Sequence, residues 1–319
     1  MFSGLISVTQ TGLDSLGLHF HETHADPAKM AWAAATTYRL FGFESAVVPL
    51  DMCVEASALG AEVDFRGDAP APTFPVVVSP LADSPSDLSL DVSGEVTKRG
   101  RIPVVLEAIH RLKDDVGQEV VVGAWIPGPF TLASQIVNFV NLMKDVASSP
   151  GEVGRVLDAL TDLLVQVALA YRDAGADFIT IHEMGGSPGV LGPKAFQSLV
   201  QPRLQRLVAA IPAPRVVSAC GRTDRYMPLL AESGAEALSV DQLNNLAKSR
   251  EAVGTSVLLF GNLDPIGTLA NGDEASVRSA VRRAIGEGAD AVWPGCDMWP
   301  PVPAANMNAM LDEARSLGS

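Results

Sequence analysis

The chain has 319 residues, of which 47% are hydrophobic, and its formal net charge at pH 7 is −14. This length fits one large α/β barrel or two ordinary domains, and the acidic charge argues against a nucleic-acid-binding protein. The first residues lack the basic region and apolar run of a signal peptide, and no stretch of about 20 apolar residues predicts a membrane span. Three cysteines cannot form a disulfide framework, so we expect a reducing cytoplasm.

Short apolar stretches that end in Gly, Asn, Asp or Pro alternate with longer stretches of helical period. This alternation predicts βα units around a parallel sheet. The eight expected strands match the number in a TIM barrel, a (β/α)8 fold. They are residues 5–8, 46–49, 120–124, 178–182, 215–218, 237–240, 257–260 and 291–293.

One stretch interrupts the alternation. Residues 61–91 contain five prolines and short β-prone pieces, which indicates an insertion between the second and third strands, laid over the barrel as a hairpin. No linker divides the chain, so we expect a single domain over residues 1–319.

Two cysteines occupy equivalent positions in this pattern. Cys220 and Cys296 each follow an apolar, strand-like stretch and lie beside glycine. If both strands belong to one barrel, both thiols reach its C-terminal rim, where active sites of this fold lie. A free cysteine is often a small buried apolar residue, but two at one rim favour a zinc site. Cys53 is expected to pack or to line a substrate pocket.

A zinc site needs a third protein ligand. His182 and Glu183 end the strand before the one that leads to Cys220, and alternation along a strand points only one of them inward. Both therefore remain candidates for the metal. A second group, His19, His21 and His24, follows the first expected strand, and these histidines are expected to be ordinary loop residues, with a rim or substrate contact as the alternative.

Other strand ends supply candidate catalytic and cofactor-binding residues. Glu183, Asp241 and Asp264 are candidates for hydrogen bonding and proton transfer, and Gly128, Gly261 and Asn262 for cofactor contacts, since glycine permits close backbone approach. The dinucleotide-binding and P-loop glycine motifs are absent, as is a Gly-x-Ser-x-Gly nucleophile elbow.

Together these segments resemble the uroporphyrinogen decarboxylase superfamily, and within it the cobalamin-dependent methyltransferase branch that includes methylcobamide:coenzyme M methyltransferase. The Gly-Asn-Leu-Asp-Pro run at 261–265 is shared across the superfamily, whereas the cysteine pair selects the methyltransferase branch. The arginine-rich N-terminal motif of the decarboxylases is missing, and the chain is expected to begin at the first barrel strand. Other segments that carry the resemblance are 24–26, 48–49, 59–63, 128–133, 174–177, 219–221 and 294–296.

The resemblance implies a zinc site built from a His-x-Cys pair and a distant cysteine. Here Ser218 occupies the histidine position, so the resemblance transfers Cys220 and Cys296 but no third ligand. Either His182 or Glu183 replaces it, or the metal is weakly held, or the site works without it.

The implied reaction moves a methyl group between a methyl-Co(III) corrinoid, delivered by a separate corrinoid protein, and a small acceptor. A thiol and a pterin such as tetrahydrofolate both remain open as acceptors. One alternative is a decarboxylase-like tetrapyrrole enzyme, for which Arg222 and Arg225 are the available carboxylate-binding pair. A non-catalytic corrinoid-binding barrel is the other.

Overall fold

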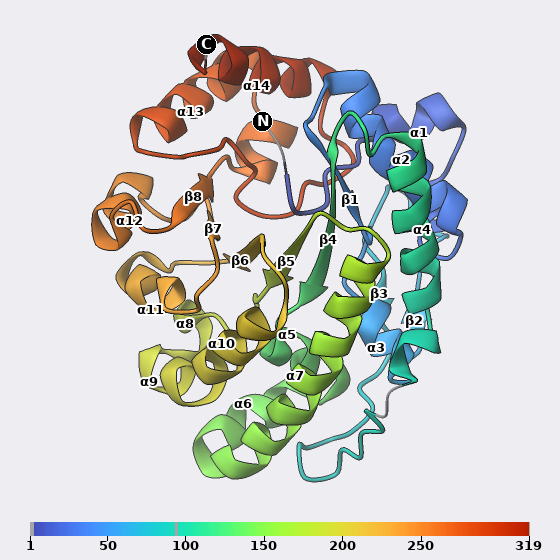
Figure 1. Cartoon of the computed structure of the whole chain (residues 1–319), viewed down its shortest axis with the longest axis vertical. Coiled ribbons are helices and arrows are strands. Elements are labelled where there is room, and N and C mark those ends of the chain that lie inside the picture. The colour runs from blue at the N-terminus through green and yellow to red at the C-terminus, as the bar shows by residue number, and fades with distance from the viewer. Residues whose placement is uncertain (1–2, 93–94, 319) are drawn as a thin grey trace.

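The computed structural model describes residues 3–92 and 95–318. At its centre is a curled sheet of parallel strands, with helices around the outside (Figure 1). The order of neighbouring strands is β1-β4-β5-β6-β7-β8. Their bounds are Ser45–Val48, Val121–Pro127, Phe178–His182, Arg215–Ala219, Ala237–Val240 and Leu258–Gly261. Nearly all of their residues are buried, as in parallel sheets that helices cover.

Long amphipathic helices connect successive strands and cover the sheet. The longest, α7 (Pro150–Asp173), buries an apolar face that includes Val156, Leu160 and Leu164. It ends just before Gly175, whose φ of 108° lies in the left-handed region. The other helices of at least eight residues are α2 (Pro27–Thr36), α4 (Ile102–Asp115), α5 (Pro129–Ile136), α6 (Phe139–Ser148), α10 (Gln201–Ala210), α12 (Leu246–Val253), α13 (Glu274–Gly286) and α14 (Ala304–Leu317).

Shorter helices lie in the connections, several of them just after a strand. They are α1 (Gln10–Leu16), α3 (Val54–Ala58), α8 (Pro188–Leu191), α9 (Pro193–Ala195) and α11 (Met227–Ala231). The short helical turns are η1 (Phe20–Thr23), η2 (Thr37–Phe41), η3 (Val96–Lys98), η4 (Phe196–Val200), η5 (Asp224–Tyr226) and η6 (Pro265–Ala270). Across the part of the chain that the structure describes, no helix is long and apolar enough to span a bilayer.

Six of the eight predicted strands are present. The predictions for the first and the last are wrong, because neither segment forms a regular strand. Residues 5–8 are buried but form no regular strand. Residues 291–295 make two isolated parallel bridges with β8 and the residues that follow it, Phe260 to Ala291 and Leu263 to Pro294. A barrel of eight regular strands is therefore not formed.

Side-chain hydrogen bonds and a proline explain this difference. The backbone N–H of Ile6 donates to Oδ1 of Asp297, and the N–H of Ser3 donates to Oγ of Ser45, so neither joins a backbone ladder. Pro294 has no N–H to donate. The backbone N–H of Met298 donates to the Ile6 carbonyl. These bonds link β8 to β1 through two irregular segments.

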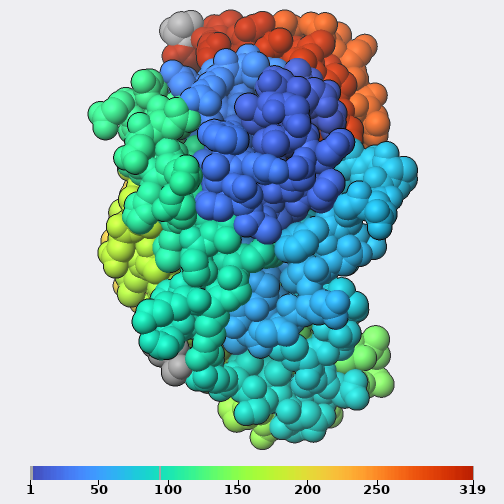
Figure 2. All heavy atoms as spheres, turned by 90° about the vertical axis from the view of Figure 1, so that its right-hand side faces the viewer, coloured from blue at the N-terminus to red at the C-terminus, as the bar shows by residue number. Residues whose placement is uncertain are grey.

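Between β1 and β4 the chain makes a long detour. Within residues 61–91, β2 (Val63–Asp64) and β3 (Val76–Val77) pair antiparallel. The detour then reaches α5, where the N–H of Leu81 donates to the carbonyl of Ile136. Figure 2 shows this part of the chain, in light blue and cyan, spread over one flank of the molecule.

Candidate metal centre

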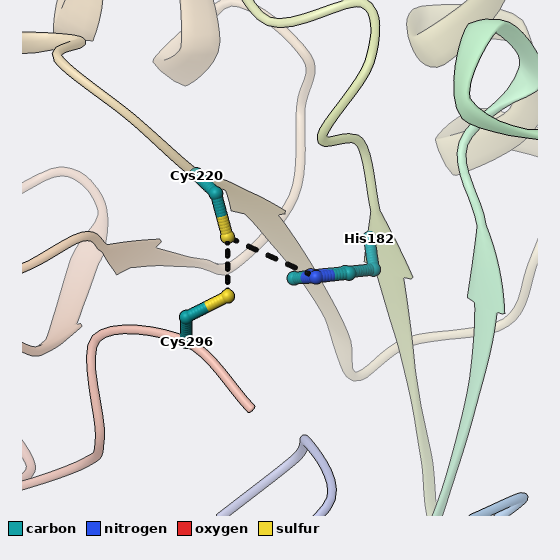
Figure 3. A group of neighbouring side chains, drawn as sticks. All are labelled: His182, Cys220 and Cys296. Atoms are coloured by element: carbon teal, nitrogen blue, oxygen red, sulfur yellow. Dashed lines mark hydrogen bonds between the residues drawn. The ribbon is translucent and has the colours of Figure 1, made fainter. Parts of the chain in front are cut away.

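Three side chains meet beyond the C-terminal ends of the strands. His182 is the last residue of β5, Cys220 directly follows β6, and Cys296 lies in the loop after the bridges to β8. Their ligand atoms lie within 4.8 Å of one another (Figure 3). Cys220 Sγ is 2.8 Å from Cys296 Sγ and 3.8 Å from Nε2 of His182. His182 is fully buried, whereas both free cysteines are half-buried.

The register of the sheet brings the imidazole to the thiols. His182 on β5 is paired with Ser218 on β6. Paired residues of adjacent parallel strands point to the same face, and residues two apart on one strand share that face. Ser218 and Cys220 therefore face the same side as His182. Oγ of Ser218 and Nδ1 of His182 are buried with no hydrogen-bond partner among the described residues.

The three groups shift one another's pKa values. The hydrogen bond from Cys220 lowers the pKa of Cys296 well below its ordinary value, against the effect of burial, and His182 lowers it further. The same bond, with burial, raises the pKa of Cys220. Burial opposes the charged form of His182, but its hydrogen bond to Cys296 and the charge of Asp297 leave its pKa raised. Cys296 is therefore the more readily ionised thiol.

Asp297 adds a carboxylate next to this cluster. Its Oδ1 accepts the Ile6 N–H at 3.0 Å, and its Oδ2 lies 3.5 Å from Nε2 of His182. Burial raises its pKa to about 6, although the charge of His182 acts in the opposite direction. Sequence reasoning missed this role, because only the contact with residues 3–8 fixes where the carboxylate points.

Asp241 and Asn244 hold the loop that carries Cys220. Asp241 Oδ2 accepts the N–H of Gly221 at 2.8 Å, and its Oδ1 accepts the N–H of Leu243 at 2.7 Å. Asn244 Nδ2 donates to the carbonyl of Gly221. Burial raises the pKa of Asp241 despite these bonds. Asp241, predicted to be catalytic, thus contacts the cysteine loop, and Asn244 escaped the sequence analysis because nothing in its local pattern marks it.

The Gly-Asn-Leu-Asp-Pro segment connects both cysteine loops. Asn262 Nδ2 donates to the carbonyls of Asn244 and Asp241, on the Cys220 side. The N–H of Leu263 donates to Trp293, and its carbonyl accepts from Gly295, on the Cys296 side. A Cβ on Gly295 would lie 2.5 Å from the backbone nitrogen of Gln242, so only glycine allows this approach.

The remaining predicted residues of this segment also make contacts within the fold. Asp264 Oδ1 caps η6 by accepting the N–H groups of Ile266 and Gly267, both at 2.9 Å. Gly261 has a φ of 150°, and a Cβ there would lie 2.7 Å from the carbonyl oxygen of Val240. Neither residue belongs to the group around His182.

Glu183 lies next to His182 in sequence but points elsewhere. Its fully buried carboxylate accepts the backbone N–H groups of Phe130, Thr131 and Gly186, and the hydroxyl of Thr131 at 2.5 Å. Burial nevertheless raises its pKa. A Cβ on Gly128 would lie 2.3 Å from Glu183 Oε2, so this glycine makes room for the carboxylate at the start of α5. The structure therefore places Glu183 outside the group of His182, Cys220 and Cys296, and it places Gly128 against the side chain of Glu183.

The N-terminal histidines separate into two environments. His24 is buried, with Nδ1 3.0 Å from Oδ2 of Asp51, and Arg101 forms a bidentate ion pair with the same carboxylate. This ion pair holds the pKa of Asp51 below its ordinary range although burial opposes it. His19 and His21 stack with centroids 5.7 Å apart and line a separate cavity with Arg66.

A family model matches nearly the whole chain. Residues 8–317 match the model described as uroporphyrinogen decarboxylase (URO-D). The chain belongs to the uroporphyrinogen decarboxylase family. The irregular segment after β8, residues 291–298, lies inside the matched region, whereas of residues 3–8 only the last is matched.

Several relatives in the uroporphyrinogen decarboxylase family are methyltransferases. The chain is 31% identical to the methylcobamide:CoM methyltransferase MtaA of Methanosarcina barkeri, covering 96% of this chain and 90% of that protein. It is 29% identical to MtbA of Methanosarcina acetivorans, covering 98% and 92%. A uroporphyrinogen decarboxylase of Syntrophotalea carbinolica is 27% identical, covering 85% and 79%. The solved structure of a Methanosarcina mazei methyltransferase matches with a TM-score of 0.94 at 29% identity, covering 100% and 94%.

In this member of the uroporphyrinogen decarboxylase family, the donor set fits zinc. Two thiols and one imidazole are the ligands that zinc prefers, and three protein ligands leave a position for a substrate. The two cysteines are half-buried, while the fully buried His182 is the last residue of β5. Such a group can hold a metal and place a soft ligand atom beside it.

Proposed function

We propose that the protein is a corrinoid-dependent methyltransferase. It transfers a methyl group from a methyl-Co(III) corrinoid to a small thiol at the cluster of His182, Cys220 and Cys296. The single observation that carries this proposal is the convergence of these three ligand atoms within 4.8 Å at the mouth of the sheet. The likeness to methylcobamide:CoM methyltransferases over more than nine-tenths of the chain supports it.

We propose His182, not Glu183, as the third zinc ligand. The four hydrogen bonds that Glu183 accepts leave it committed to the start of α5, whereas Nε2 of His182 faces the thiols. Zinc held there would stabilise an acceptor thiol as a thiolate at neutral pH. Asp241 and Asn262 position the loops that carry the ligands, and Asp297 orients His182.

The chemistry balances without an added oxidant or reductant. The acceptor thiol loses its proton to solvent, and its sulfur lone pair forms the new S–C bond with the methyl carbon. The Co–C bond breaks with both electrons remaining on cobalt, so Co(III) becomes Co(I). Thiols are preferred here over a pterin because the donor set is soft, and soft metal sites favour sulfur.

The mouth of the sheet is also where a corrinoid protein would dock. Exposed apolar side chains follow the C-terminal ends of several strands, among them Val190 after β5, Leu243 after β7, Ile266 after β8 and Trp299 after Cys296. We call these four residues the apolar rim. We regard the fold as a (β/α)8 barrel in which the first and last strands have become irregular, with the rim around its C-terminal mouth. Free thiols at this site require a reducing compartment, such as the cytoplasm.

The test compares cysteines inside and outside the cluster. Zinc content and methyl transfer from methylcobalamin to a panel of thiols and tetrahydrofolate are measured for the wild type, for Cys220→Ala with Cys296→Ala, and for Cys53→Ala. We expect about one zinc per chain for the wild type and Cys53→Ala, Co(I) formation with a thiol for the wild type, and neither for the double variant.

Other outcomes identify the competing functions. Wild-type protein without zinc, or a double variant with full activity, would contradict the metal site. Turnover with tetrahydrofolate alone would assign the pterin as acceptor. Release of carbon dioxide from a tetrapyrrole would favour the decarboxylase, and corrinoid binding without turnover would favour a binding protein.

A further inference from the structure

A cavity of about 390 Å³ lies beside the metal cluster. The segment of residues 74–77, which includes β3, forms one wall, and the chain after β1 forms another. Side chains that line it include Ile6, Met52, Cys53, Phe74, Val77 and Asp297. Its exposed lining is therefore mostly hydrocarbon and sulfur.

Asp297 connects this cavity to the cluster. It follows Cys296 directly, and its Oδ2 lies 3.5 Å from Nε2 of His182. The cavity thus offers a space, next to Asp297, in which the remainder of a thiol acceptor can sit while its sulfur approaches the cluster. Ile6, which donates its N–H to Asp297, lies at the same end of the cavity.

The charge of the lining discriminates among acceptors. Of the residues that line this cavity within the described part of the chain, Asp297 is the one with an acidic or basic side chain. A sulfonate or carboxylate tail would meet this carboxylate in a largely apolar space whose lining residues include no cation, which is unfavourable. The nearby guanidinium of Arg101 is already bound by both oxygens of Asp51, at 2.6 and 2.8 Å.

We propose that the acceptor is a thiol with a short, uncharged, apolar substituent, such as an alkane thiol, and not a thiol with an anionic tail. This inference rests on the proposed methyl transfer and specifies its substrate. It distinguishes this chain from relatives that are named for coenzyme M, a thiol that carries a sulfonate. In the reaction the alkane thiol loses its proton to solvent, its S–C bond forms, the Co–C bond breaks, and cobalt keeps both electrons.

The experiment compares propane-1-thiol with 2-sulfanylethanesulfonate, using free methylcobalamin as donor and zinc-loaded protein. We expect kcat/KM for propane-1-thiol to exceed that for the sulfonated thiol by roughly tenfold or more, since a buried unpaired charge is costly. Calorimetric binding of the two thiols without donor should show the same order. Equal values, or a preference for the sulfonated thiol, would overturn the inference and leave the methyl-transfer proposal standing.

A variant with an added positive charge sharpens the test. Val76 lines the cavity and is 40% exposed, so Val76→Arg adds a cation at the mouth with little cost to folding. We expect this variant to bind the sulfonated thiol roughly tenfold more tightly and so narrow the preference. Leu40→Arg, at an equally exposed site on η2, should leave the preference unchanged. If neither thiol is methylated by the wild type, the proposed function itself fails, and this inference with it.

Discussion

At the scale of single residues, the proposed zinc site would keep an imidazole in its donor set but take it from a different strand. Ser218 stands where the methyltransferase pattern has histidine, and its cross-strand partner His182 supplies an imidazole instead. Neighbouring strands are about 4.8 Å apart, a distance that an imidazole spans. The ligand atoms still converge within 4.8 Å.

This relocation predicts a reciprocal rescue. His182→Ala should weaken zinc binding by more than the roughly 10- to 100-fold that loss of an outer-shell partner costs, because a direct ligand is removed. Adding Ser218→His to that variant should restore much of the affinity, since the imidazole returns on the adjacent strand. Competition with a chromophoric chelator measures both. The exposed His19 provides the control, and His19→Ala should bind zinc like the wild type. Undiminished affinity in His182→Ala would remove His182 from the site.

The sequence identified the two cysteines and His182 for a physical reason: each follows or ends an apolar run, and parallel strands end at one edge. It left His182 and Glu183 unresolved because only the direction of the strand and the donors at the start of α5 separate them. Asp297 and Asn244 were not identified, since both act through loops whose shape no local pattern specifies.

Glu55 makes the stability of the protein depend on pH. Its carboxyl is almost fully buried in α3, near the hydroxyl of Tyr171, and burial raises its pKa to about 8. In the unfolded chain it ionises near its ordinary pKa of 4.5. Between these values the folded protein retains a proton that the unfolded chain releases. The stability that this group contributes is therefore complete below pH 4.5 and falls as pH rises toward 8, by at most about 1.4 kcal/mol per unit.

Glu55→Gln should remove this dependence, because the amide does not titrate. The free energy of unfolding of the variant, relative to that of the wild type, should rise steadily between about pH 5 and pH 8 and then level. Urea titrations across this range measure it. If the unfolding free energies of the two proteins change with pH in parallel, the Glu55 carboxyl is not held neutral in the folded protein.

At the scale of elements, the Gly-Asn-Leu-Asp-Pro segment, residues 261–265, holds two loops together by hydrogen bonds, and we call this segment the brace. Its hydrogen bonds reach Asp241 and Asn244 on one side and Trp293 and Gly295 on the other. Because each loop carries one cysteine, the segment sets the distance between the two thiols. A superfamily motif that supplies none of the three clustered side chains can in this way determine the geometry of the proposed metal site.

The brace predicts a coupled loss of stability and metal affinity. Asn262→Ala removes two hydrogen bonds to buried carbonyls and should cost about 1–3 kcal/mol of unfolding free energy together with zinc affinity. Asn306 is a matched control, since its buried Nδ2 also donates to two backbone carbonyls, those of Leu269 and Gly272. Asn306→Ala should lose similar stability and retain zinc affinity. Equal zinc affinity in both variants would show that the brace does not position the thiols.

The strands show where sequence reasoning about elements succeeds and where it stops. Six apolar runs became strands close to their expected bounds because each pairs with a neighbour on both sides or is covered by helices. Residues 5–8 and 291–293 are equally apolar. The N–H of Ile6 instead donates to the side chain of Asp297, which lies far away in the sequence, and residues 291–293 are followed by Pro294, which has no N–H to donate.

At the scale of the whole molecule, the charge and the apolar rim suggest different roles in association. A net charge of −14 keeps the protein soluble and repels acidic partners over long distances. The apolar rim consists of side chains that follow the strand ends and are 42% to 51% exposed, and exposed apolar side chains of this kind are what protein interfaces bury. A corrinoid that is bound to a carrier protein must approach the cluster across this rim, because the carrier is too large to enter the site.

The rim predicts that two methyl donors will respond differently to one substitution. Val190→Asp with Ile266→Asp should lower kcat/KM for a corrinoid-binding protein loaded with methylcobalamin by roughly tenfold or more, because each buried anchor contributes more than about 1 kcal/mol. Free methylcobalamin arrives without a carrier protein, so the kcat/KM of the variant with this donor should stay within about twofold of the wild-type value. Leu40→Asp, exposed on η2, should alter neither rate. If both donors slow together, the substitutions have disturbed the cluster; if neither slows, the carrier docks elsewhere on the molecule.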